Sequence, residues 1–171
     1  VYDEVVEKVV ALTKERVKVG SGEEWGTTVN ADVDEKQYKS ILGYIESGKE
    51  EGKLLHGGNA VGDEGYYIEP TIIADLPRTA KVVNEEIFGP VLSIVKAKDF
   101  DEALDIANQT EYGLTGSVYA KDRDVLEKAR YRFDVGNLYF NRRCTGAMMG
   151  VHPFGGMKLS GTNTKSGGPD Y

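Results

Sequence analysis

Apolar residues recur every three to four positions in several stretches of the chain, a pattern that is typical of amphipathic helices with one buried face. Asp34 is suited to cap the second of these helices, and Asp99 with Glu102 forms a capping signal for the third. The predicted helices cover residues 2–16, a segment after Asp34 that ends near residues 48–52, a segment after Asp99 that includes residues 103–107, and residues 122–133. The apolar stripe of the first helix requires a partner surface.

Short runs of β-branched, aromatic and leucine residues lie between and after these helices and predict strands. They cover residues 54–57, 66–74, 91–95, 115–120 and 135–140. Pro70 interrupts the second run. Because proline has no backbone N–H to donate, we expect that strand to lie at a sheet edge or to carry a bulge.

The last three predicted strands alternate with two predicted helices. This order indicates right-handed crossovers and an α/β fold, with a mostly parallel open sheet flanked by helices. Parallel sheets place their ligands beyond the carboxyl ends of the strands. The segment after residue 140 leaves the predicted sheet at such an end, loses all helical and strand periodicity and is rich in glycine. It is expected to be a binding loop, with a mobile C-terminus as the alternative.

Composition narrows the class of protein. The 171 residues suit one domain, and the net charge of -7 is spread along the chain, which argues against a nucleic-acid surface and for a soluble cytoplasmic protein. One cysteine excludes an internal disulfide, and no apolar run approaches the roughly 18 residues that a membrane span needs. With two histidines and no cysteine cluster, we expect no metal site. The chain begins at Val1 without an initiator methionine and enters a predicted helix at once, so we expect it to be a piece of something longer.

Two places carry candidate chemistry. Glu85 and Glu86 lie in a predicted turn before Phe88, where a carboxylate can accept hydrogen bonds from both hydroxyls of a ribose and the ring can cover an apolar ring face. The alternative is a solvated acidic turn with Phe88 anchored in the core. Cys144 with His152 could form a thiol nucleophile and its base, as in a hydrolase, although a lone cysteine in a polar loop is more often inert.

Residues 85–91 resemble the cofactor-contact motif of the aldehyde dehydrogenase superfamily, and residues 153–161 resemble its second C-terminal signature. Residues 112–115 and 136–141 lie between them in the family's order. Residues 144–147 and the stretch after Gly161 resemble the branch that oxidises glutamate semialdehyde to glutamate in proline and arginine breakdown. The resemblance covers essentially the whole chain and implies a partial aldehyde dehydrogenase catalytic domain.

The resemblance also implies NAD as the cofactor and a role for each candidate residue. Glu86 would hold the nicotinamide ribose, and Phe88 would flank the nicotinamide ring. Thr145, Gly146 and Ala147 would bind the substrate carboxylate through backbone amides and a hydroxyl. Phe154 would pack on the aliphatic part of the substrate, and the Asn141 side chain would hold the loop in place.

By the same resemblance, residues 1–171 are the C-terminal part of the catalytic domain. The NAD domain, the catalytic cysteine and an oligomerisation strand lie outside them, and Cys144 does not occupy the nucleophile position. We therefore expect the isolated chain to lack dehydrogenase activity and to bind NAD weakly, and the parent enzyme to be a homo-oligomer with no nucleic-acid or membrane partner. The alternative is a non-catalytic binding or assembly module with the same fold.

Overall fold

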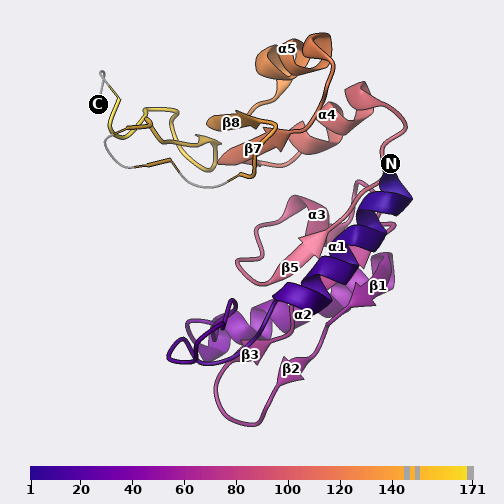
Figure 1. Ribbon diagram of the computed structural model, residues 1–171, viewed down its shortest axis with the longest axis vertical. Helices are drawn as coiled ribbons and strands as arrows, with labels where there is room; N and C mark the ends of the chain where they lie inside the picture. The colour runs from indigo at the N-terminus through magenta and orange to yellow at the C-terminus, as the bar shows by residue number, and fades with distance from the viewer. Residues whose placement is uncertain (145–146, 149–150, 169–171) are drawn as a thin grey trace. The chain divides into compact units, whose positions relative to one another are not determined.

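A computed structural model describes residues 1–144, 147–148 and 151–168 of the chain. The chain divides into two compact units, Val1–Lys96 and Ala97–Tyr171, whose elements are labelled in Figure 1. Each unit has its own hydrophobic core and its own small sheets.

The first unit contains three helices: α1 (Tyr2–Arg16), α2 (Glu35–Glu51) and the short α3 (Lys81–Asn84). The predicted cap of α2 is confirmed, because the Asp34 carboxylate accepts a hydrogen bond from the Gln37 backbone N–H at 2.7 Å. α1 has no fully buried residue. Its first turn is tied to the unit through the Tyr2 hydroxyl, which donates to the Asp75 carboxylate and accepts from the Asp75 N–H, both at 3.0 Å.

The main sheet of the first unit has the order β1–β4–β5, formed by Lys53–His56, Thr71–Ala74 and Val91–Ser93. β1 pairs with β4 in antiparallel fashion with a register shift between Leu54 and His56, and β5 pairs with β4 in parallel fashion. A separate antiparallel pair joins β2 (Ala60–Val61) to β3 (Tyr67–Ile68). The core is made of two clusters of buried residues, which are Ile73, Leu76, Ala80 and Val82, and Ile41, Ile45 and Ile68.

The prediction that the strand around Pro70 lies at a sheet edge is wrong. The proline separates β3 from β4, and β4 is the fully buried central strand of its sheet. Pro70 itself lies just outside the ladder, which begins at Thr71, so its missing N–H costs no sheet hydrogen bond. The bulge occurs in the partner strand β1 and not beside the proline.

The second unit contains α4 (Phe100–Asn108) and α5 (Arg123–Arg132). β7 (Thr115–Val118) pairs with β8 (Asn137–Phe140) in parallel fashion, and α5 connects the two strands, which confirms the predicted strand–helix–strand order with parallel pairing. β6 (Tyr112–Gly113) pairs with β9 (Met157–Lys158) in antiparallel fashion. Leu104, Val118 and Ala129 form the buried core between the helices and the β7–β8 pair.

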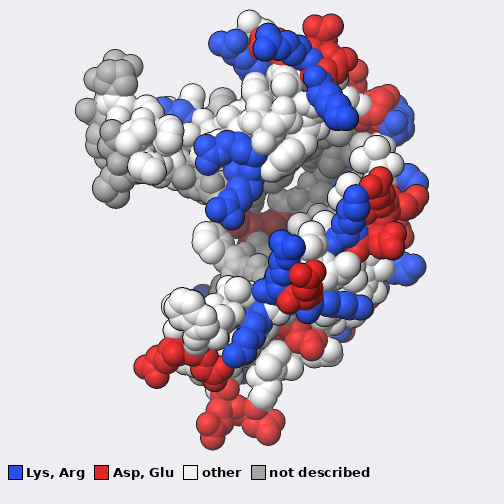
Figure 2. All heavy atoms as spheres, viewed as in Figure 1, with Lys and Arg blue, Asp and Glu red and all other residues white. Residues whose placement is uncertain are grey.

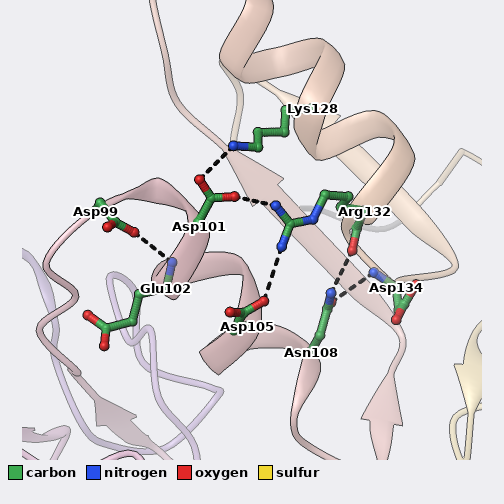
Figure 3. Close-up of polar contacts among 8 residues, drawn as sticks. All are labelled: Asp99, Asp101, Glu102, Asp105, Asn108, Lys128, Arg132 and Asp134. Atoms are coloured by element: carbon green, nitrogen blue, oxygen red, sulfur yellow. Dashed lines mark hydrogen bonds and ion pairs between the residues drawn. The ribbon is translucent and has the colours of Figure 1, made fainter.

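Helices α4 and α5 are joined at the surface by a polar network, which Figure 3 shows. The Asp101 carboxylate binds the Lys128 amine at 2.6 Å and also the Arg132 guanidinium, which reaches Asp105 at 3.1 Å. The Asn108 side chain accepts from the Asp134 N–H at 2.9 Å and donates to the Arg132 carbonyl. Hydrogen bonds from Lys128 and then Arg132 hold the pKa of Asp101 below its usual value.

The α/β class is confirmed, but the prediction of a mostly parallel sheet is not: within the described part of the chain, three of the five strand pairs, β1–β4, β2–β3 and β6–β9, are antiparallel. Among the described residues, β5 pairs with β4 and β7 pairs with β8, so the three alternating strands do not form one continuous sheet. Hydrophobic periodicity identifies a strand but not its neighbour.

Figure 2 shows acidic side chains dispersed among basic ones on the visible face. In the part of the chain that the structure describes, no helix combines the length and apolar character that crossing a membrane requires.

Candidate functional site

The turn formed by residues 85–90 follows α3 and presents a phenylalanine on the surface. Ile87 packs against both core clusters of the first unit, whereas Phe88 is 76% exposed. The alternative in which Phe88 anchors the core is therefore wrong, because Ile87 does so. An exposed ring of this size in a turn that is otherwise anchored is available to a ligand.

The backbone of this turn is held in an uncommon conformation. Phe88 has a φ of +52°, in the left-handed region that aromatic residues rarely adopt. The Gln37 side-chain amide donates to the carbonyls of Ile87 at 2.8 Å and Phe88 at 3.2 Å. A Cβ on Gly89 would lie 2.7 Å from the buried side chain of Ile41, so glycine is required there. Contacts on both sides thus fix the backbone from which the Phe88 ring projects.

The two adjacent carboxylates of the turn have different surroundings. Glu85 accepts a hydrogen bond from the Tyr44 hydroxyl at 2.7 Å and lies 3.9 Å from the Lys81 amine. Glu86 is exposed, and within the described residues no hydrogen bond or ion pair engages its carboxylate. Glu85 holds the turn to α2, and Glu86 remains able to accept hydrogen bonds from a ligand. A free carboxylate two residues from an exposed ring fits a ligand that carries vicinal hydroxyls beside a flat ring.

Asn141 lies at the carboxyl end of β8 with a φ of +53°. Its side-chain oxygen accepts from the Ala120 N–H and its side-chain nitrogen donates to the Ala120 carbonyl, both at 3.0 Å. Its own N–H donates to Val118 at 2.9 Å. These bonds join the start of the terminal loop to the segment after β7, which is the geometry that a loop-supporting role needs. The role itself stays a prediction.

The described part of the terminal loop is joined by hydrogen bonds to the rest of the second unit. Phe154 is half-buried and exchanges two backbone hydrogen bonds with Ser166, at 3.0 and 2.8 Å. β9 pairs with β6, and the Gly113 N–H donates to the Ser160 hydroxyl at 3.1 Å. The alternative of a mobile C-terminus does not describe residues 151–168.

Of the remaining candidate residues of the terminal loop, some are described by the structure and some are not. Thr145 and Gly146 lie outside the described residues, and Ala147 is half-buried. Cys144 is a free, exposed thiol. The His152 Nδ1 accepts a hydrogen bond from the Met148 N–H at 3.3 Å, and among the described residues no hydrogen bond joins Cys144 to His152. The structure thus gives no support to a Cys144–His152 nucleophile and base.

Gln37, Asn137 and Lys165 all bind backbone groups of the candidate sites, and sequence reasoning assigned none of them a role. Gln37 is separated from Ile87 by 50 positions, and Lys165 from Gly136 by 29 positions. No local pattern predicts such contacts. The one available signal for Asn137 was its place in the motif at residues 136–141.

Comparison with known proteins defines the class of protein to which this fold and these sites belong. The model of the aldehyde dehydrogenase family matches residues 1–171, so the chain belongs to the aldehyde dehydrogenase family. The resemblance that the sequence motifs indicated is thereby confirmed.

Within that family, the chain is similar to 1-pyrroline-5-carboxylate dehydrogenases. It is 57% identical to the enzyme of Anoxybacillus flavithermus and 56% identical to that of Bacillus subtilis, over 100% of this chain and 33% of each relative. A solved 1-pyrroline-5-carboxylate dehydrogenase from Thermus with bound NAD matches with a TM-score of 0.93 and 52% identity, over 99% of this chain and 33% of that one. Proline utilization A from Bdellovibrio bacteriovorus matches with a TM-score of 0.92 and 43% identity, over 99% of this chain and 18% of that one. The chain spans about one third of the length of the curated relatives it matches.

Proposed function

We propose that this chain is the C-terminal part of the catalytic domain of an NAD-dependent 1-pyrroline-5-carboxylate dehydrogenase. The parent enzyme oxidises glutamate semialdehyde to glutamate in proline and arginine catabolism. The observation that carries the proposal is the turn at residues 85–90, which offers a free carboxylate and an outward ring in a chain that is similar to such dehydrogenases from end to end. A solvated acidic turn without a ligand would not need the contacts that hold Phe88 outward.

On the cofactor side, the proposed roles belong to Glu86 and Phe88. The Glu86 carboxylate accepts hydrogen bonds from the two ribose hydroxyls next to the nicotinamide, and the Phe88 ring flanks the nicotinamide. NAD supplies the hydride acceptor when it is bound. Gln37 and Gly89 support this pair, because they fix the backbone from which both side chains project.

On the substrate side, the proposed roles belong to the terminal loop. Backbone amides of Thr145, Gly146 and Ala147, with the Thr145 hydroxyl, bind the substrate carboxylate, because backbone donors bind an anion without a mobile charged side chain. The Phe154 ring packs on the aliphatic part of the substrate. Asn141 supports the loop through its two bonds to Ala120.

The proposal divides the work between this chain and the rest of the parent enzyme. The relatives are about three times as long as this chain and would supply the Rossmann-like NAD domain, the nucleophilic cysteine and the oligomerisation strand. Cys144 is an exposed bystander in this assignment. The parent enzyme is a cytoplasmic homo-oligomer, and the 171 residues alone do not catalyse the reaction.

The test is NADH production by the full-length protein with glutamate semialdehyde, compared with propionaldehyde, which lacks the carboxylate. We expect kcat/KM to be on the order of 100-fold higher for glutamate semialdehyde, because the anion-binding amides act only on that substrate. The isolated chain serves as the negative control. Equal activity with both aldehydes would remove the assignment of the loop, and NADH production by the isolated chain would contradict the division of work.

A further inference from the structure

The backbone around Phe154 is held by polar groups on every side. The Asn137 side chain donates to the Pro153 carbonyl at 2.9 Å and accepts from the Gly155 N–H at 3.2 Å, so it brackets Phe154. The N–H and carbonyl of Phe154 itself pair with Ser166. One amide side chain in β8 thus fixes the residue before and the residue after the ring.

Lys165 completes this arrangement from the opposite direction. Its amine donates to the Gly155 carbonyl at 3.1 Å and to the Gly136 carbonyl. The side chain is half-buried, and burial lowers the pKa of the amine. A charge-assisted donor between two carbonyls joins the segment that bears Phe154 to the start of β8.

The close approach of the two backbones explains why these side chains are needed. A Cβ on Gly136 would overlap the Gly155 carbonyl, so the two backbones are in direct contact and no side chain lies between them. Polar bonds from Asn137 and Lys165 join the two segments at this contact.

We propose that Asn137 and Lys165 are positioning residues that clamp the backbone on both sides of Phe154. By fixing the position of this ring they set the affinity of the site for the aliphatic part of its substrate. Neither residue is placed against the substrate, so both act through the ring. The role at the substrate rests on the function proposed above, whereas the clamp itself rests only on the geometry.

Lysine variants of the full-length protein test the clamp, because the chain offers a matched control. Lys158 also donates to two backbone carbonyls, those of Asn108 at 2.7 Å and Thr110 at 3.1 Å, and neither carbonyl belongs to the segment that bears Phe154. For Lys165→Met we expect the KM for glutamate semialdehyde to rise about tenfold, with kcat and the KM for NAD each within about threefold of wild type, since only the fit around the substrate changes. Lys158→Met should leave all three within about threefold.

A second measurement keeps the clamp testable if the substrate assignment fails. Amide hydrogen exchange in residues 154–156 should be about tenfold faster in Lys165→Met and Asn137→Ala than in wild type, and unchanged in Lys158→Met. A wild-type protein that does not oxidise glutamate semialdehyde would overturn the proposed function, while faster exchange would still support the clamp. Unchanged exchange would overturn the clamp. Faster exchange with an unchanged KM in an active enzyme would overturn its role at the substrate.

Two further variants distinguish loss of the clamp from misfolding of the protein. Lys165→Arg keeps a cationic donor of similar reach, so we expect it to restore the KM to within about threefold of wild type. Asn137→Ala removes the bracket without touching Lys165, and should raise the KM for glutamate semialdehyde about as much as Lys165→Met does. A Lys165→Arg enzyme that is as impaired as Lys165→Met, or an Asn137→Ala enzyme with the wild-type KM, would contradict the proposal.

Discussion

The turn at residues 85–90 and the loop segment at residues 153–156 each present one phenylalanine, but they are held in different ways. The turn is anchored mainly by apolar packing, with Ile87 against both core clusters and Gly89 against Ile41, and the Gln37 amide adds two bonds to its backbone. The loop segment is held by bonds from polar side chains to backbone groups, chiefly from Asn137 and Lys165. Both arrangements fix a ring, and they should fail differently when they are disturbed.

Apolar anchoring couples the turn to the stability of the whole first unit, because the same residues form the core. Polar bracketing leaves the loop segment only weakly coupled to the core of the second unit, since a side-chain-to-backbone bond contributes about 1 kcal/mol net. Substitutions in the core beneath the turn are therefore expected to destabilise the protein, whereas substitutions in the loop segment are expected to change substrate binding in a stably folded protein.

The largest effect is expected from Ile41→Ala. Ile41 is fully buried, and truncating it removes packing from α2 and from Gly89 together, which should lower the free energy of unfolding by about 3 kcal/mol. Urea unfolding of the full-length protein measures the change. Val33→Ala is the control, since Val33 is 86% exposed and its truncation should cost less than about 0.5 kcal/mol. Equal costs for the two variants would show that the turn does not depend on the core.

Gly136→Ala is expected to have the next largest effect, and it acts on the loop segment. The added methyl group overlaps the Gly155 carbonyl, so the segment that bears Phe154 must shift. Misplacing a substrate contact in this way should lower kcat/KM for glutamate semialdehyde about 100-fold. Gly43→Ala in α2 is the control, because its Cβ would meet nothing within 4 Å; it should keep full activity and raise stability by about 0.5 to 1 kcal/mol. Full activity in Gly136→Ala would contradict the account.

Phe88→Gly separates stability from function in the turn. Glycine adopts the φ of +52° without strain, so the free energy of unfolding should stay within about 1 kcal/mol of wild type. Loss of the ring should raise the KM for NAD about tenfold. Steady-state kinetics and urea unfolding on the same preparation measure both. A large loss of stability would show that the ring is a structural residue after all.

The smallest effect is expected from Asp101→Asn in the network between α4 and α5. The pKa of Asp101 is lowered in the folded protein, so its charged form adds stability above the usual pKa of 3.8, and this is lost as the pH falls through the folded-state pKa. Asp101→Asn should therefore lower the urea midpoint slightly at neutral pH, and the difference from wild type should vanish in acid. Added salt should shrink it, because the pairs are exposed. A difference that grows on acidification would contradict this assignment.

The sequence predicted those parts of the fold that depend on neighbouring residues. The starts of α2 and α4 agree with the prediction because their caps, Asp34 and Asp99, act within three positions. The sheet depended on partners far along the chain. Pro70 correctly marked a break, but its neighbour β4 lies at the centre of the sheet, since a break in one strand does not reveal which strands flank the next.

The candidate site shows the same limit. Sequence reasoning placed Glu85 and Glu86 in a turn, and the structure confirms that placement. It could not tell which carboxylate is free, because Tyr44, which engages Glu85, lies 41 positions away. The roles of Asn137 and Lys165 were not predicted for a related reason. An asparagine and a lysine in polar segments look like ordinary surface residues unless their distant backbone partners are known.

The most direct test of the central claim compares two adjacent carboxylates in the full-length protein. Glu86→Gln should weaken NAD binding about tenfold and leave the thermal midpoint within about 1 °C of wild type, because a charged acceptor for the ribose hydroxyls is lost while no protein contact changes. Glu85→Gln should lower the thermal midpoint and leave NAD binding nearly unchanged, because its partner is Tyr44. Isothermal titration with NAD and a melting curve give both values. Wild-type NAD affinity in Glu86→Gln would contradict the assignment of this turn to the cofactor.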